Sequence, residues 1–177
     1  HMCVAAYTTK GYENLVHLST MSHKNFHNKP LIDHGDLATL SEQGLLAGLV
    51  GTSGCYFGYI SQSLDKGDFA DAEALMKAYN GWFKNSGGLF VTELQNHNID
   101  HDNGHDDDVL AGYLWNLSEA LSIPVILTQD SHYCHEHDKP VHEALKRIVS
   151  FGPEPEDAVF PGDGFHLASA EWFQEHH

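Results

Sequence analysis

Residues 123–133 read IPVILTQDSHY, an apolar run followed at once by polar side chains. The apolar part, 123–128, reads as a β-strand. Asp130 and His132 come directly after it, two residues apart. Because side chains alternate along an extended chain, these two point to the same side and can reach one ion. The stretch predicts a strand that presents two metal-ligand side chains at its carboxyl end.

Strand-like and helix-like segments alternate along the rest of the chain. The expected strands are 2–7, 46–52, 89–94, 123–128 and 165–167, and the expected helices are 10–21, 36–45, 68–83, 106–121, 140–149 and 169–174. The helix 68–83 has the clearest apolar stripe, at steps of three and four, and Asp68 is its expected N-cap. This order predicts parallel βαβ units in an α/β fold, either an open sheet or a barrel, within one domain.

Composition and charge limit the classes of protein to which the chain can belong. Its 177 residues are enough for one domain with a hydrophobic core. The formal net charge is −16 and Arg147 is the only arginine, so the chain lacks the broad basic surface with which many proteins bind nucleic acid. If it acts on a polyanion, bound cations must supply most of the positive charge, and its 15 histidines and 25 acidic residues could hold them.

The cysteines and the lack of long apolar segments bear on location. No segment has the length of a membrane span, and none resembles a signal peptide. The three cysteines contain no CxxC pair, which favours a reducing compartment over a disulfide scaffold. We therefore expect a cytoplasmic protein with no membrane partner.

A further metal-ligand side chain follows another predicted strand. Residues 53–55, SGC, come directly after the run 46–52. The carboxyl ends of parallel strands meet at one edge of a sheet, so we expect Cys55 to converge with Asp130 and His132. A thiolate, an imidazole and a carboxylate suit zinc, manganese or iron better than calcium. Spacing alone leaves two alternatives open, namely a turn with a buried cysteine at SGC and a solvated loop at DSH.

Residues 97–108, HNIDHDNGHDDD, form a competing cluster of three histidines and five aspartates. The cluster could chelate a metal by itself, but it lacks the glutamate-ended pattern of an EF-hand loop. The favoured interpretation is a polar loop that leads into the acidic first turn of a helix. A thiol hydrolase around Cys55 has no supporting sequence signature, and the chain has no glycine-rich phosphate loop followed by Lys-Ser/Thr.

Seven segments, taken together and in order, resemble one known family. They are HMCVAAYTTKGYENLVHLSTMSH (1–23), KPLID (29–33), TSGC (52–55), ELQNH (93–97), IPVILTQDSHY (123–133), VHEAL (141–145) and FHLAS (165–169). The set is similar to the later part of the PHP (polymerase and histidinol phosphatase) domain of bacterial DNA polymerase III alpha subunits. The resemblance covers nearly the whole chain.

The resemblance implies a fold and a metal site. The PHP fold is a distorted barrel of βα units with up to three metal ions at one end. The residues that match the family's metal ligands by position are His1, Cys55, Asp130 and His132. Zinc or manganese is the expected ion, with iron or magnesium as alternatives. Glu93 and His97 fall in the family's strand that ends in Gln-Asn-His, near the site, where either could relay protons.

The resemblance also implies that part of the family's domain is missing. The family's domain opens with a strand that carries a His-x-His motif, and that strand would precede residue 1. We therefore expect a PHP-like distorted βα barrel that is N-terminally truncated and incomplete. Its exposed sheet edges would stay open, or would be covered by a second copy of the chain or by another polypeptide.

Two functions are compatible with this resemblance. Some PHP members are phosphoesterases, and some polymerase-attached members are metal-dependent 3′→5′ exonucleases. The first hypothesis is a metal-dependent phosphoesterase, a 3′→5′ exonuclease on DNA or RNA that uses a metal-activated water. The alternative is a non-catalytic PHP module that docks on or stabilises a separately encoded replicative DNA polymerase.

If a second copy covers the exposed sheet edges, the chain forms a homodimer. Size-exclusion chromatography with light scattering should then give twice the mass of the chain at high protein concentration. A stable monomer under those conditions would contradict the homodimer.

Overall fold

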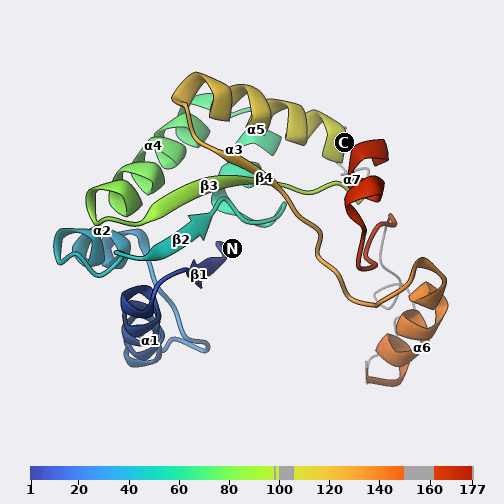
Figure 1. Cartoon of the computed structure of the whole chain (residues 1–177), viewed down its shortest axis with the longest axis horizontal. Coiled ribbons are helices and arrows are strands. Elements are labelled where there is room, and N and C mark those ends of the chain that lie inside the picture. The colour runs from blue at the N-terminus through green and yellow to red at the C-terminus, as the bar shows by residue number, and fades with distance from the viewer. Residues whose placement is uncertain (98, 100–105, 150–161, 177) are drawn as a thin grey trace. The chain divides into compact units, whose positions relative to one another are not determined.

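The computed structural model describes residues 1–97, 99, 106–149 and 162–176 (Figure 1). The chain divides into two compact units. Unit 1 consists of His1–Glu93 and Leu114–Ile126, and unit 2 consists of Leu94–Tyr113 and Leu127–His177. The expectation of a single domain stays a prediction.

Strands and helices alternate largely as the sequence predicts. Their bounds are β1 (Val4–Ala6), α1 (Thr9–Lys24), α2 (His34–Glu42), β2 (Leu49–Thr52), α3 (Tyr59–Asp65), α4 (Phe69–Asn85), β3 (Leu89–Leu94), α5 (Asp107–Leu121), β4 (Val125–Leu127), the 3-10 helix η1 (Glu136–Asp138), α6 (Lys139–Val149) and α7 (Ala170–His176). Two short helices, α3 and η1, were not predicted. The strand expected at 165–167 is wrong, because this segment makes only one isolated bridge, between Tyr133 and His166.

The strands form one sheet in the order β1-β2-β3-β4 (Figure 1). The α/β class is confirmed, and β2 and β3 pair in parallel as expected, with Thr52 opposite Val91. Among the described residues β1 and β4 are the two ends of the sheet, so the distorted barrel is not confirmed. None of the helices in the described part of the chain is long and apolar enough to cross a membrane.

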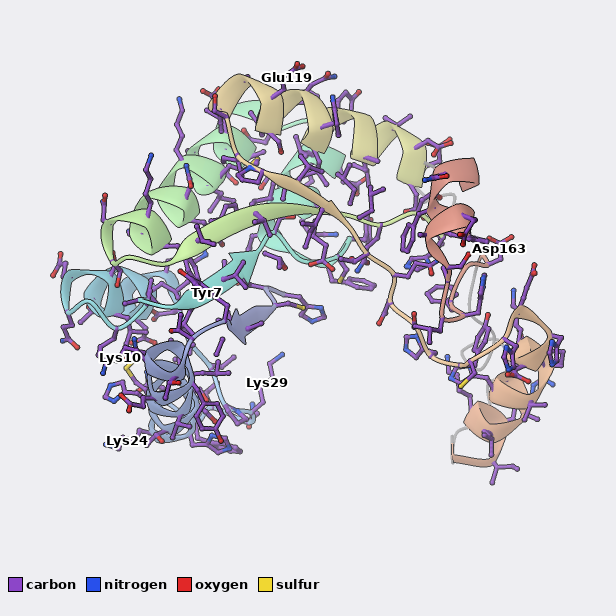
Figure 2. All side chains as sticks on the ribbon, viewed as in Figure 1. Tyr7, Lys10, Lys24, Lys29, Glu119 and Asp163 are labelled. Carbon is purple, nitrogen blue, oxygen red and sulfur yellow. The ribbon has the colours of Figure 1, made fainter. Side chains whose placement is uncertain are left out.

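The direction of β1 corrects the expectation of parallel units throughout. β1 runs antiparallel to β2, with Val4 opposite Gly51. Tyr7, labelled in Figure 2, lies just after β1 and donates its backbone N–H to the Gly48 carbonyl at 3.1 Å, just before β2. The connection through α1 and α2 therefore returns the chain to the end of the sheet at which it left. A parallel pair would require the chain to cross to the opposite end.

Helix α4 supplies much of the core of unit 1 and packs on β2 (Figure 1). Asp68 caps the helix as predicted, accepting the Asp71 backbone N–H at 3.0 Å. The predicted stripe is buried at Ala72, Met76, Tyr79 and Phe83. Phe69, at the first turn, is 49% exposed, so the stripe begins one turn later than the periodicity predicts.

The Phe83 ring requires a glycine on the strand beneath it. A Cβ built on Gly51 of β2 would lie 2.4 Å from a ring carbon of Phe83. Phe83 also packs against Phe90 of β3, with ring centroids 6.3 Å apart. The absence of a side chain at Gly51 therefore lets α4 approach the sheet closely.

Gly51→Ala should destabilise the protein by about 1–3 kcal/mol, because the added methyl group overpacks the Phe83 ring. Urea denaturation followed by circular dichroism would measure the change. The matched control is Gly81→Ala in α4, where an added Cβ meets nothing within 4 Å. This control should gain about 0.5–1 kcal/mol from helix propensity. Equal stability of the two variants would contradict the close packing of Phe83 on β2.

Candidate functional site

The turn after β2 places Cys55 beside His1, although the two are 54 positions apart. Cys55 Sγ lies 3.7 Å from His1 Nδ1. The backbone nitrogen of His1 donates to the Phe57 carbonyl at 3.1 Å. The His1 ring also lies near the Phe57 ring, with centroids 5.9 Å apart. Cys55 is half-buried, so SGC is a turn whose thiol is not sequestered in the core.

Two glycines allow the chain at His1 to lie against this turn. Gly54 has a φ of 78°, and a Cβ there would lie 2.6 Å from the His1 carbonyl oxygen. A Cβ on Gly58 would lie 2.5 Å from the Ser53 carbonyl oxygen and 3.1 Å from that of His1. Glycine tolerates both the positive φ and the close approach of the backbone. The glycine of the SGC motif is therefore needed for the contact between Cys55 and His1.

The spacing of these two side chains fits a zinc-type ion. Zn–S and Zn–N bonds of about 2.3 and 2.0–2.1 Å at a tetrahedral angle separate the two ligand atoms by about 3.6 Å. The separation of Cys55 Sγ and His1 Nδ1 is 3.7 Å. The two residues thus have both the chemistry and the spacing of a ligand pair.

In unit 2, Asp130 and His132 follow β4 as predicted. His132 Nδ1 lies 2.6 Å from the backbone oxygen of Asp130 and 3.9 Å from its carboxylate oxygen Oδ1. A carbonyl at Nδ1 keeps the proton there and puts the lone pair of the ring on Nε2, which is how metal-binding histidines are commonly oriented. The Asp130 side chain is 60% exposed, so its carboxylate is accessible.

His97 is a buried histidine of unit 2. Its ring stacks on Phe165, with centroids 4.1 Å apart and planes within 4°, and Phe165 also meets His132 edge-on. Nδ1 lies 3.3 Å from the carbonyl oxygen of Asp163, which is labelled in Figure 2. Nε2 is buried and has no hydrogen-bond partner among the described residues. The His97 ring is therefore held by stacking and by its Nδ1 contact, and within the described ranges its other nitrogen has no hydrogen-bond partner.

Burial also sets the protonation state of His97. Desolvation lowers the pKa of His97 below the ordinary histidine value, while the nearby Asp107 carboxylate acts in the opposite direction. The neutral ring is therefore the dominant form at pH 7. With the Nδ1 proton directed at Asp163, the lone pair is on Nε2.

Glu93, the other predicted proton relay, is hydrogen-bonded to the residues that lead into the turn carrying Cys55. The residue is only 6% exposed, and Oε2 accepts the Thr52 hydroxyl at 2.5 Å. Its backbone N–H donates to Ser53 Oγ at 2.9 Å. Glu93 thus contacts the two residues that precede Gly54 and Cys55.

The structure brings four of the predicted residues together as two pairs. His1 meets Cys55 in unit 1, and Asp130 meets His132 in unit 2; convergence of the pairs on one ion stays a prediction. In the described ranges no group of three or more His, Cys, Asp or Glu side chains could hold a metal.

Most of the competing cluster at 97–108 lies outside the described residues. Within them, one Asp107 carboxylate oxygen accepts the backbone N–H groups of His97 and Ile99, at 2.8 and 3.1 Å. This contact attaches the backbone of His97 and Ile99 to the first turn of α5. It supports the interpretation of a polar segment that leads into a helix.

The residues that sequence reasoning missed are those that hold the predicted ones. They are Thr52, Ser53, Asp107 and Phe165. Thr52 and Ser53 had a local signal, because they adjoin the SGC turn. Phe165 had none, since only the folded chain brings it onto His97.

Comparison with known proteins identifies the family of this region. Residues 1–97 match the family model of the PHP domain. The chain is 32% identical over 147 residues to DNA polymerase III subunit alpha of Borreliella burgdorferi, covering 82% of this chain and 12% of that protein. It is 28% identical over 177 residues to the same subunit of Deinococcus radiodurans, covering 98% of this chain and 12% of that protein.

A third relative carries a different name. The chain is 29% identical over 161 residues to the error-prone DNA polymerase of Symbiobacterium thermophilum, covering 82% of this chain and 14% of that protein. The chain therefore spans only 12–14% of the length of these three relatives.

The lowered pKa of His97 predicts a pH dependence of stability. The unfolded chain binds a proton at this residue near pH 6.5, whereas the folded chain binds it only at lower pH, so stability is lost as pH falls below about 6.5. Thermal melts of the metal-free protein at about pH 7.5 and pH 5.5 should therefore show a smaller loss of Tm for His97→Gln than for the wild type. His17→Gln, which changes an exposed residue of α1, is the control and should keep the wild-type loss. An unchanged loss in His97→Gln would contradict the burial of a neutral ring.

Proposed function

The chain belongs to the PHP domain family, as its resemblance predicted, and on this basis we propose that it is a metal-dependent phosphoesterase that acts as a 3′→5′ exonuclease on DNA or RNA. The single observation that carries this proposal is the approach of Cys55 Sγ and His1 Nδ1 to 3.7 Å, the spacing of two ligands on one zinc-type ion. Relatives over this region bear the names of DNA polymerases, which makes nucleic acid the proposed substrate class.

The charge of the chain supports dependence on metal ions. A net charge of −16 with 9 lysines and arginines leaves few side chains to neutralise a phosphate backbone. A phosphoesterase must nevertheless stabilise negative charge on the phosphoryl oxygens in the transition state. Divalent cations held by histidine, cysteine and aspartate would supply what arginine does not.

The proposed ligands are His1 and Cys55 in unit 1 and Asp130 and His132 in unit 2. A zinc or manganese ion, when bound, supplies Lewis acidity towards a phosphate oxygen and towards the water nucleophile. The Cys55 thiolate and the Asp130 carboxylate offset positive charge. His132 presents Nε2, because the Asp130 carbonyl holds its Nδ1.

His97 is the proposed proton acceptor. Its neutral ring has the lone pair on Nε2, and stacking on Phe165 fixes the direction of that lone pair. Glu93 was predicted as a second relay. Because Oε2 of Glu93 accepts the Thr52 hydroxyl in a buried position, its surroundings support a role in holding the adjacent turn instead.

A second candidate is a non-catalytic PHP module that docks on or stabilises a separately encoded replicative polymerase. The observation that favours it is the lack, among the residues that the structure describes, of any group of three ligand side chains around one point. Such a module would keep the fold without turnover.

Metal content and nuclease activity should depend on Asp130 and His132. Plasma mass spectrometry of the purified chain should find bound zinc or manganese. With Mn²⁺, a 5′-labelled single strand should be shortened stepwise from its 3′ end. Asp130→Ala combined with His132→Ala should lower the rate by about 100-fold or more, because two ligands are lost.

The matched control is His135→Ala combined with His137→Ala. These two exposed histidines stack on each other in the same segment, so the control removes nearby histidines without touching the proposed ligands. The control should keep wild-type activity. Cleavage that persists in the first double variant would contradict the proposed ligands, and a wild-type chain without metal or cleavage would favour the non-catalytic module.

A further inference from the structure

We propose that Glu93 is a positioning residue, whose buried carboxylate acts through the Thr52 hydroxyl to hold the turn that presents Cys55. The inference rests on the proposed function, because it takes Cys55 to be a metal ligand. It assigns Glu93 a part in placing that ligand, without contact between Glu93 and the substrate.

The first step is the burial of a carboxylate beside a hydroxyl. Glu93 is 6% exposed and Thr52 is 9% exposed, and Thr52 Oγ1 donates to Glu93 Oε2 at 2.5 Å. A carboxylate away from water is stable only when hydrogen bonds compensate for the lost hydration. Hydrogen bonds to an ionised oxygen are shorter and stronger than those between neutral groups. The Thr52 side chain is therefore held in one orientation.

The Thr52 hydroxyl also accepts a hydrogen bond from the backbone of the turn. Because the single Thr52 hydroxyl proton is directed at Glu93, its lone pairs are available on the other side. The backbone N–H of Gly54 donates to Thr52 Oγ1 at 3.2 Å. Gly54 immediately precedes Cys55 and has the left-handed φ of 78° that reverses the chain. The carboxylate thus acts through one hydroxyl on the backbone amide adjoining the thiol-bearing residue.

Hydrogen bonds between Ser53 and β3 also hold this turn. Ser53, which is 2% exposed, accepts the Glu93 backbone N–H at 2.9 Å. Its own backbone N–H donates to the Val91 carbonyl at 3.1 Å. The residues between β2 and Cys55 are therefore attached to the end of β3 by both backbone and side-chain bonds.

The spacing around Cys55 leaves little room for this turn to move. An added Cβ on Gly54 would lie 2.6 Å from the His1 carbonyl oxygen, and one on Gly58 would lie 2.5 Å from the Ser53 carbonyl oxygen. A displacement of the turn would change the 3.7 Å separation between Cys55 and His1. Binding sites lose affinity when their ligands shift by about 1 Å, so the bonds from Glu93 set the quality of the ligand pair.

The test compares Thr52→Val, which removes the hydroxyl at nearly constant volume, with Thr52→Ser, which keeps it. The first measurement is the rate at which iodoacetamide alkylates Cys55 in the metal-free protein, followed by peptide mass spectrometry. Exposed Cys134 in the same molecules is the internal reference. The Cys55 rate relative to Cys134 should change about fivefold or more in Thr52→Val and stay within about twofold of wild type in Thr52→Ser.

The second measurement titrates the metal-free protein with Co²⁺ and follows the thiolate-to-cobalt absorption in the near ultraviolet. Thr52→Val should weaken Co²⁺ binding by about 10–100-fold, as the loss of supporting hydrogen bonds commonly does, and Thr52→Ser should restore it. If the wild type lacks this absorption while Cys55→Ser and wild type bind Co²⁺ alike, the proposed ligand role of Cys55 fails. The alkylation rates still decide the positioning role.

Glu93→Gln keeps the test decisive if Thr52→Val does not fold. This variant keeps the volume and an acceptor oxygen but removes the charge, and it should change the relative Cys55 rate in the same direction by a smaller factor. Unchanged Cys55 rates and unchanged Co²⁺ affinity in folded Thr52→Val or Glu93→Gln would overturn the inference. A change that Thr52→Ser shares in full would overturn it as well, because the hydroxyl would then be irrelevant.

Discussion

The parallel pairing of β2 and β3 is the constraint on which the candidate site of unit 1 depends. Because both strands run the same way, their carboxyl ends lie side by side, with Thr52 opposite Val91. That register brings Glu93, near the end of β3, within reach of the two residues that leave β2. A buried carboxylate there needs a donor, and the Thr52 hydroxyl supplies it, while Ser53 Oγ accepts the Glu93 backbone N–H. The turn that carries Cys55 is therefore determined by sheet register.

Two of the histidines of unit 2, His97 and His132, lie in different surroundings. In both rings Nδ1 faces a backbone carbonyl, that of Asp130 for His132 and that of Asp163 for His97. His132 stands on an exposed segment beside an accessible carboxylate, which suits a metal ligand. His97 is buried against an aromatic ring that lowers its access to water, and desolvation lowers its pKa, which suits a neutral base. Local surroundings therefore give two side chains of the same type different access to water.

The parts of the structure that follow from neighbours in sequence were predictable. The stripe of α4 and its Asp68 cap depend on residues within a few turns, as does the position of Cys55 just past β2. The antiparallel direction of β1 was not predictable, because it is set by the path of α1 and α2 between Tyr7 and Gly48. The stacking of Phe165 on His97 depends on a contact between distant segments that no local periodicity records. The strand expected at 165–167 failed for a related reason, since Phe165 packs onto the His97 ring, Leu167 is 70% exposed and the segment makes one isolated bridge.

The main chain of His1 is held by backbone contacts and lies against glycines, which carry no side chain. His1 and these glycines therefore differ in the substitutions that they tolerate. The main chain of His1 lies close to Gly54 and Gly58, and its backbone nitrogen donates a hydrogen bond to the Phe57 carbonyl. None of these contacts involves the imidazole. Exchange of the His1 ring would remove its contacts with Cys55 and Phe57 and leave these backbone contacts in place, whereas a side chain at Gly54 would not fit. One substitution at His1 would thus remove the candidate ligand pair and leave the backbone of the turn unchanged.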